Sequence, residues 1–245
     1  MRTVVEVVAR CGPGGRTVLP VVRGGGALAA RVTGAGVVHL VGTAAGPLGG
    51  DTVLVRVRVE AGARLVLRSV AASVVLPDRS GAPSGTVTEL DVAAGGRLDL
   101  GLSPTVVTAR AAHTASTLVR IAPGGRLRLA EQVVLGRVGE GPGRWTGTVR
   151  VERSGRPLLH TTQGLGPGTP GWAGPFTPRA YAAELVLDGV DTTPAVREAA
   201  VRLPLPGGRT ATAWAGHLDA ALAELARLDP AADPAQPAGA LAGAR

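Results

Sequence analysis

Three acidic residues are the best candidates for chemistry in this chain of 245 residues. Asp51, Glu131 and Glu140 all lie beside glycine or apolar runs, where a folded protein tends to exclude water. Because a buried carboxylate needs a partner or a function, these residues could provide oxygen ligands or a polar lining along a path for a cation. A structural interpretation is also open, in which Asp51 caps a turn after Gly49 and Gly50, and Glu131 ends a strand.

The usual motifs of catalysis and cofactor binding are missing from the sequence. The histidines lie far apart in the sequence and form no His-x-His or His-x-x-x-His pair that would point two nitrogens at one ion, so we interpret each as structural: His39, His113, His160 and His217. A phosphate-binding loop requires a lysine, and the sequence contains none. The glycine-rich runs at 139–143 and 164–168 precede no helix pattern, and no nucleophile elbow is present. The sequence therefore predicts a protein that is not an enzyme and binds no cofactor tightly.

The net charge of +8 and the pI of about 11.4 would suit a nucleic-acid partner. However, every basic residue is arginine, which is the bias expected of a GC-rich genome. The arginines of the strand-like segments stand singly, for example Arg64, Arg97 and Arg126, and form no basic tract. Aromatic side chains on which bases could stack are also scarce, at 2%. We therefore expect no specific binding to nucleic acid.

Cysteine usage and hydropathy favour a cytoplasmic location. Cys11 is the only cysteine and cannot form an intramolecular disulfide. Glu6 and Arg10 interrupt the apolar region that a signal peptide would need. The longest uncharged stretch, 32–50, contains Pro47 and several glycines, so a buried strand and turn is a better prediction than a membrane-spanning helix. We expect no membrane partner.

A repeated phrase indicates the fold. Residues 52–60 alternate valine with arginine or glutamate, the pattern of a half-buried strand. A glycine corner and a second strand follow, and this strand, corner and strand recur as VEAGARLVL at 59–67, VAAGGRLDL at 92–100 and IAPGGRLRL at 121–129. Such repetition is typical of stacked coils. We predict a mainly β fold, a β-solenoid or layered β-helix, with CGPGGRTVL at 11–19 as an atypical first unit. A β-sandwich with recurrent glycine turns is the alternative.

Beyond residue 130 the pattern changes. Glycine and proline predict surface loops at 139–143 and 164–178. Strands are predicted at 181–187 and 199–204, followed by an amphipathic helix within 213–228. Overall we expect a single domain over 1–228, with one or two short C-terminal helices, and a disordered tail rich in proline and alanine over 229–245.

Four segments, in this order, resemble the urease accessory protein D family, which is also called UreD or UreH. They are the glycine-rich run 41–51 that ends in Gly49-Gly50-Asp51, the turn at 59–65, the V-A-A-S segment that ends at Ser73, and E-Q-V-V-L-G-R at 131–137 with Gly139 and Glu140 after it. The resemblance covers about residues 1–225. The sequence departs from the family pattern at Val74 and Val75, Leu102 and Ser103, and Thr161.

The resemblance implies a β-helical scaffold that serves urease maturation. Its expected partners are the urease apoprotein and the accessory protein UreF, which recruits the GTPase UreG. Nickel would pass in transit through a polar interior, and the positions that correspond are Asp51, Ser73 and Glu131. The binding positions implied are Gly49, Gly50, Gly136, Arg137 and Glu140. The alternatives from the residues alone are a carbohydrate-active β-helix enzyme, which would need two carboxyl groups at a defined separation, and an arginine-rich nucleic-acid binder.

Overall fold

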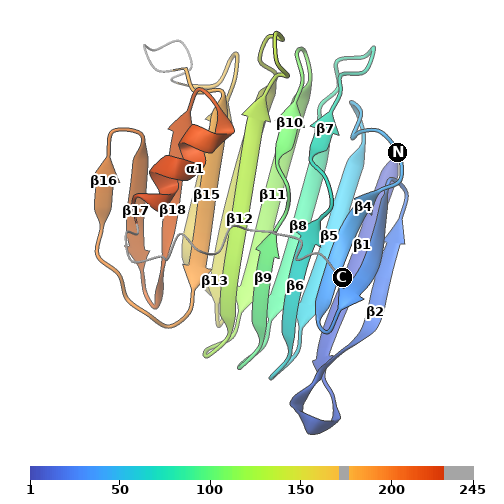
Figure 1. The fold of residues 1–245 in the computed structure, drawn as a ribbon, viewed down its shortest axis with the longest axis vertical. Coiled ribbons are helices and arrows are strands. Elements are labelled where there is room, and N and C mark those ends of the chain that lie inside the picture. Colours follow the sequence, from blue (N-terminus) through green and yellow to red (C-terminus); the bar gives the residue numbers. More distant parts are fainter. Residues whose placement is uncertain (171–176, 229–245) are drawn as a thin grey trace, which may run out of the picture.

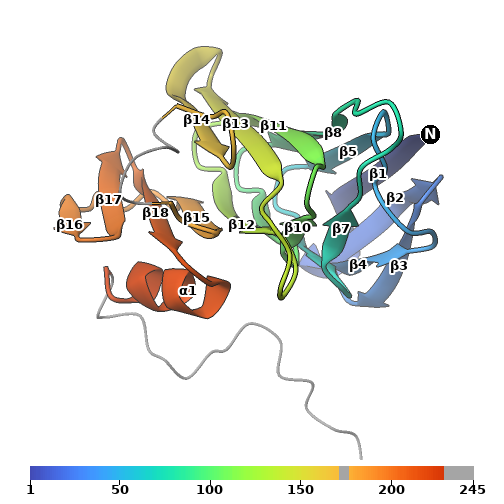
Figure 2. The same ribbon diagram turned by 90° about the horizontal axis from the view of Figure 1, so that it is seen from above.

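Two β-sheets that face each other make up most of the structure (Figure 1, Figure 2). The computed structural model describes residues 1–170 and 177–228. Sheet A contains, from edge to edge, β14 (Arg156–Leu165), β13 (Arg144–Arg153), β11 (Ala112–Ile121), β8 (Ser84–Val92), β5 (Thr52–Val59), β1 (Arg2–Cys11) and β2 (Thr17–Gly25). Sheet B contains β16 (Ala195–Arg197), β17 (Ala200–Leu205), β18 (Gly208–Ala215), β15 (Ala180–Leu187), β12 (Arg126–Leu135), β9 (Arg97–Gly101), β6 (Arg64–Ser69), β4 (Val37–Gly42) and β3 (Leu28–Gly34). The short strand β10 (Thr105–Val107) pairs with β12, and the short strand β7 (Ser73–Val75) pairs with β10.

Each coil consists of a strand of sheet A, a glycine corner and a strand of sheet B. The three copies of the repeated phrase connect β5 to β6, β8 to β9 and β11 to β12. Strands of successive coils run parallel and in register, with Thr86 between Val53 and Ala115. Gly62 turns the first of these corners at a φ of 73°, a conformation in which a side chain would be strained. The structure therefore confirms the predicted β-solenoid of stacked coils.

Alternation along the strands builds the core between the sheets. Val55 and Val57 of β5 point inward and are each only 2% exposed, whereas Arg56 and Arg58 point to solvent. Leucines of β6, β9 and β12 belong to the same buried cluster from the side of sheet B. Each such side chain contributes about 1.5–3 kcal/mol when it is removed from water. The apolar half of the interior lies towards the glycine corners, at the lower end of the molecule in Figure 1.

The glycine phrase at 11–19 forms a hairpin and not a coil, so the prediction of an atypical first unit there is wrong. β1 and β2 pair antiparallel through the short 3-10 helix η1 (Pro13–Gly15), with Val7 opposite Val22. The returning strand finds its hydrogen-bonding partners in β1, and both strands therefore remain in sheet A. A second hairpin, β3 and β4, forms the corresponding edge of sheet B.

The C-terminal part extends sheet B with antiparallel strands. The strands predicted at 181–187 and 199–204 are confirmed as β15 and β17. The helix α1 (Leu218–Ala226) packs on the outer face of sheet B, against β15 and β18 (Figure 2). It begins later than the predicted segment, because Ala213 and Ala215 still belong to β18 and pair with β15.

The predicted loop at 139–143 is confirmed between β12 and β13. In the segment predicted as a loop over 164–178, β14 continues to Leu165, and residues 171–176 lie outside the described residues. The tail predicted over 229–245 also lies outside them.

Candidate functional site

The interior changes from apolar to polar along the strands, and the polar half lies at the upper end of the molecule in Figure 1. On β8 the inward positions begin with Ser84, Thr86 and Thr88 and continue with Leu90 and Val92. β11 changes in the same direction, from His113 and Thr117 to Val119 and Ile121. Because the strands are in register, these polar positions meet in one region between the sheets.

Two adjoining cavities occupy this polar region. The larger has a volume of about 280 Å³ and the smaller about 90 Å³. They share four lining residues: Thr86, Leu102, Ser103 and Thr105. The larger cavity borders the interruption in sheet B where β6 ends and β7 begins, and Leu102 and Ser103 belong to the matching interruption between β9 and β10. Ser103 bridges the two breaks, since its N–H donates to Ser69 Oγ at 2.8 Å.

Asp51 lies at the upper end of the larger cavity, just before β5, and is 7% exposed. Its Oδ2 accepts a hydrogen bond from the N–H of Leu48 at 2.9 Å, and its Oδ1 contacts the amine of Met1. That amine and the Leu48 N–H hold the pKa of Asp51 below its ordinary value, so the side chain is a carboxylate at neutral pH. The interpretation of Asp51 as a turn cap is confirmed, and the same side chain also lines the cavity.

Ser73 lines the same cavity from the opposite sheet. It is the first residue of β7, is exposed, and lies beside Thr105 of β10 in the parallel pairing. These two residues thus line the cavity from neighbouring strands. Asp51 and Ser73 are therefore brought together around one cavity.

Glu131 lies in the smaller cavity and not at the end of a strand, so the interpretation as a strand end is wrong. It occupies the middle of β12, opposite Ala183 of β15, and shares the inward parity of Leu129 and Val133. The strand continues past it because β15 supplies hydrogen bonds along the whole segment. Burial raises the pKa of Glu131 to about 7. Burial also raises the pKa of Tyr181, and the carboxylate of Glu131 adds to that rise.

Sequence reasoning missed a buried pair, Ser84 and His113, of which His113 lines the smaller cavity together with Glu131. Ser84 and His113 are 1% and 4% exposed, and the Ser84 hydroxyl lies 2.8 Å from His113 Nδ1. Burial lowers the pKa of His113 to about 4, so the ring is neutral at physiological pH. Both residues occupy inward positions of their strands. The sequence did contain a signal for this pair. At the start of β8 and β11, polar residues occupy the alternate positions that are apolar further along the same strand.

The glycines predicted as binding positions lie in loops stacked at the upper end. Gly49 and Gly50 donate their N–H groups to the carbonyls of Leu76 and Pro83, which belong to the next coil. Gly136 has a φ of 76° and donates to the carbonyl of Val107. These contacts are backbone to backbone and explain the glycines as parts of tightly stacked turns.

Arg137 and Glu140 form an ion pair in the loop after Gly136, outside both cavities. Glu140 Oε2 accepts from Arg137 Nε at 3.0 Å and from the N–H of the same residue at 3.0 Å. These bonds lower the pKa of Glu140 to about 2. Glu140 therefore closes its own loop and is separated from Asp51, Ser73 and Glu131.

Over residues 1–170 and 177–228, no three His, Cys, Asp or Glu side chains come together in a group that could hold a metal ion. In the same residues, no helix has both the length and the apolar character that crossing a membrane requires.

The fold and the site define a β-solenoid protein with a polar hollow between its two sheets. Comparison with known proteins points to one family. The family described as UreD urease accessory protein matches residues 5–228. The Urease accessory protein UreD of Frankia alni is 43% identical, over 80% of this chain and 73% of the relative. The protein of the same name from Streptomyces coelicolor is 38% identical, over 84% and 87%, and that from Streptomyces avermitilis is 41% identical, over 71% of each. The chain belongs to the UreD urease accessory protein family, and its role is in urease maturation.

Proposed function

We propose that this chain is a non-enzymatic scaffold through which nickel reaches apo-urease. The ion is cargo that passes along the hollow between the sheets, from the larger cavity to the smaller. The observation that carries this proposal is the placement of Asp51, Ser73 and Glu131 around two cavities that share four lining residues. The proposed partners are the urease apoprotein and the accessory proteins UreF and UreG.

The lining has the chemistry that transit requires. An ion that enters and leaves must exchange hydration water for ligands that bind weakly, and hydroxyl and carboxylate oxygens hold Ni²⁺ less firmly than thiolates or imidazoles do. The carboxylate of Asp51 attracts the cation at one end of the path, and the hydroxyls of Ser103 and Thr105 lie between.

Glu131 gives the smaller cavity, at the other end of the proposed path, a charge that can change. Its pKa of about 7 means that the side chain is partly protonated at neutral pH. A divalent cation nearby favours the carboxylate, so arrival of the ion releases a proton and departure allows the proton to return. The buried site therefore need not hold an uncompensated negative charge when it is empty.

The stacked loops at the upper end are the proposed docking region for partners. They include Gly49 and Gly50 on one side and the turn of Gly136, Arg137 and Glu140 on the other. Loops held by a rigid scaffold are common sites of recognition. Membership of the urease accessory family favours this role over the two alternatives, a carbohydrate-active enzyme and a nucleic-acid binder.

The test is co-expression of urease with its accessory proteins and variants of this chain, followed by measurement of nickel per urease and of urease activity. Asp51→Asn is the informative change at the larger cavity, because the amide oxygen can still accept the Leu48 N–H while the charge is lost. Asp91→Asn, on the outer face of sheet A, is the matched control. We expect Asp51→Asn, and more strongly its combination with Glu131→Gln, to lower nickel per urease several-fold, and the control to leave it unchanged.

Two outcomes would separate the parts of the proposal. Normal nickel content with a folded double variant contradicts the path through the hollow. Loss of urease activity in cells without the chain, with full recovery by the double variant, keeps the maturation role and contradicts only the transit of nickel.

A further inference from the structure

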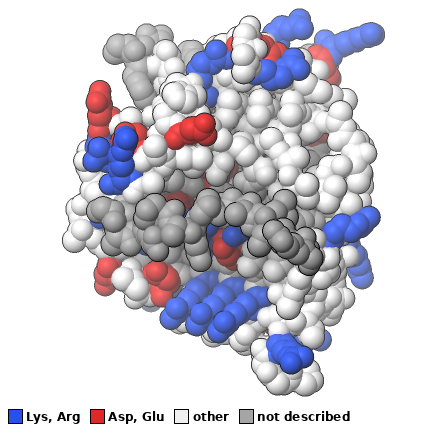
Figure 3. Space-filling view, in the orientation of Figure 1, with Lys and Arg blue, Asp and Glu red and all other residues white. Residues whose placement is uncertain are grey.

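A row of three arginines lies across sheet B near the glycine corners. Arg64, Arg97 and Arg126 are the first residues of β6, β9 and β12, and the parallel register places each directly beside the next. All three are exposed and point away from the core, since Leu65, Leu98 and Leu127 after them are buried. Figure 3 shows a blue patch at the lower ends of these strands. Residues scattered in the sequence thus form one surface, which we call the arginine row.

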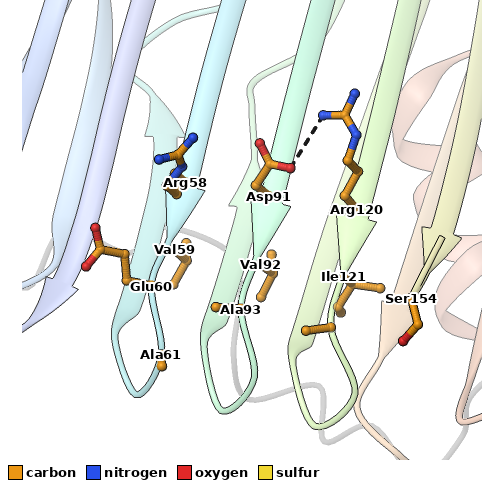
Figure 4. Close-up of a pocket in the computed structure, with 11 residues that line it drawn as sticks. Arg58, Val59, Glu60, Ala61, Asp91, Val92, Ala93, Arg120, Ile121 and Ser154 are labelled. Atoms are coloured by element: carbon orange, nitrogen blue, oxygen red, sulfur yellow. Dashed lines mark hydrogen bonds and ion pairs between the residues drawn. The ribbon is translucent and has the colours of Figure 1, made fainter.

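The arginine row lacks the pairing seen on the outer face of sheet A. There, the cross-strand order Arg58, Asp91, Arg120 and Glu152 alternates in sign, and Arg120 contacts Asp91 at 3.4 Å (Figure 4). A second cross-strand order that alternates in sign is Arg23, Glu6, Arg56 and Glu89. In it, Arg23 contacts Glu6 at 3.4 Å and Arg56 contacts Glu89 at 2.8 Å. Opposite charges on neighbouring strands stabilise a sheet, and like charges destabilise it.

On sheet B, the arginines just above the row are also paired. Arg68 contacts Asp99 at 2.6 Å, and Arg128 contacts Glu184 at 2.7 Å. Among the described residues, by contrast, the side chains of the arginine row form no ion pair or hydrogen bond. A bias of the genome towards arginine explains the number of arginines but not why three of them lie side by side on parallel strands.

The surface under the arginine row has a shape as well as a charge. A shallow groove of about 280 Å³ runs over the row and is also lined by Val66, Val186 and Arg128. Two carboxylates line it as well, Asp188 and Asp99, and Asp99 is already paired with Arg68 and Arg128. Val66 and Val186, together with the aliphatic stems of the arginines, give the groove an apolar floor beneath charged ends. A glutamate side chain matches this arrangement, because its methylene groups can contact the floor while its carboxylate meets a guanidinium.

We propose that the arginine row binds an acidic α-helix of a partner protein. Neighbouring strands are about 4.8 Å apart, so the row spans about 10 Å. Acidic residues at i, i+4 and i+7 of a helix span about 10.5 Å on one face, whereas three successive same-side residues of an extended chain span about 13.6 Å. Nucleic acid fits less well, because none of the residues that line the groove offers an aromatic ring for stacking. This proposal does not depend on nickel transit.

The test uses the full chain and a fluorescent helical peptide of about 16 residues with glutamate at three such positions. The triple variant Arg64→Gln, Arg97→Gln and Arg126→Gln removes the row. Its matched control, Arg16→Gln, Arg79→Gln and Arg156→Gln, removes the same charge from exposed arginines elsewhere. All six positions are exposed, and circular dichroism checks that both triple variants fold.

We expect the row variant to bind the glutamate peptide at least fivefold more weakly than the parent chain, and the control to change binding by less than twofold. A peptide with glutamine in place of glutamate should bind at least fivefold more weakly to the parent. Equal losses in both triple variants would contradict the proposal, since binding would then follow net charge alone. Tighter binding of a single-stranded oligonucleotide of equal charge, or a dimer of the chain that the row variant abolishes, would also overturn the choice of partner.

Discussion

Two titratable groups that line the smaller cavity, Glu131 and His113, should give the protein opposing dependences of stability on pH. The pKa of Glu131 is raised from its ordinary 4.5 to about 7. Between these pH values the folded protein holds a proton that the unfolded chain releases. The stabilising effect is therefore fully present below pH 4.5 and is lost as the pH rises through about 7.

His113 acts in the opposite direction. Its pKa is lowered from 6.5 to about 4, so between these values the unfolded chain takes up a proton that the folded protein does not. Its stabilising effect is fully present above pH 6.5 and is lost as the pH falls through about 4. A tenfold change in proton affinity corresponds to about 1.4 kcal/mol, and each residue therefore changes the free energy of unfolding by about 3 kcal/mol over its range. In the parent protein the two effects largely cancel.

Single substitutions should reveal each effect. Relative to the parent, Glu131→Gln should have a similar free energy of unfolding at pH 4.5 and a value about 3 kcal/mol higher at pH 8, because the neutral amide has no charge to bury. His113→Gln should gain about 3 kcal/mol relative to the parent between pH 7.5 and pH 4. Urea denaturation of the parent and both variants at five pH values measures these differences directly.

The control is Glu198→Gln, which removes an exposed carboxylate in the turn between β16 and β17, at the edge of sheet B, and should follow the parent at every pH. If the difference between Glu131→Gln and the parent is the same at pH 4.5 and pH 8, the carboxylate is solvated and the account of Glu131 is refuted. Parallel profiles for His113→Gln and the parent would refute the account of the histidine in the same way.

Two further predictions concern packing. Gly136 and Gly139 have φ values of 76° and 74°, but a Cβ at Gly136 would clash with the carbonyl oxygen of Gly141, whereas at Gly139 it would meet nothing within 4 Å. Thermal unfolding should show a loss of about 3 kcal/mol or more for Gly136→Ala and of about 1 kcal/mol for Gly139→Ala, and equal losses would argue against the stacked loop. Trp145 is 1% exposed and lies 5.4 Å from Tyr181 between ring centroids. Trp145→Ala should cost about 3–5 kcal/mol, and a cost below 1 kcal/mol in urea denaturation would contradict its place in the core.

The coils could be predicted because their signals are local. Alternating valines in 52–60 fix which side of β5 is buried, and the glycine corner that follows fixes where the chain turns. The same reasoning failed at 11–19, where similar glycines close a hairpin. The difference lies in which strand accepts the returning chain, and this depends on long-range pairing of β2 with β1 and not on the turn itself.

The site was only partly predictable for a related reason. Asp51 follows two glycines, and its turn can be read from the sequence. The position of Glu131 inside the hollow requires knowledge that β12 continues along β15 and that its neighbour β9 ends at Gly101, beside Ala130. The arginine row is invisible in the sequence for the same reason, because Arg64, Arg97 and Arg126 are brought together only by the register of three strands.

The most direct test of nickel transit is to block the hollow where its two cavities meet. Thr86 lines both cavities and points inward from β8, so Thr86→Phe should fill their junction. Thr52→Phe, on the exposed face of the neighbouring strand β5, adds the same bulk outside. In cells that express urease and depend on this chain, the account predicts that nickel per urease falls at least fivefold with Thr86→Phe and stays at the parent level with Thr52→Phe. Normal nickel content with a folded Thr86→Phe variant would contradict the account.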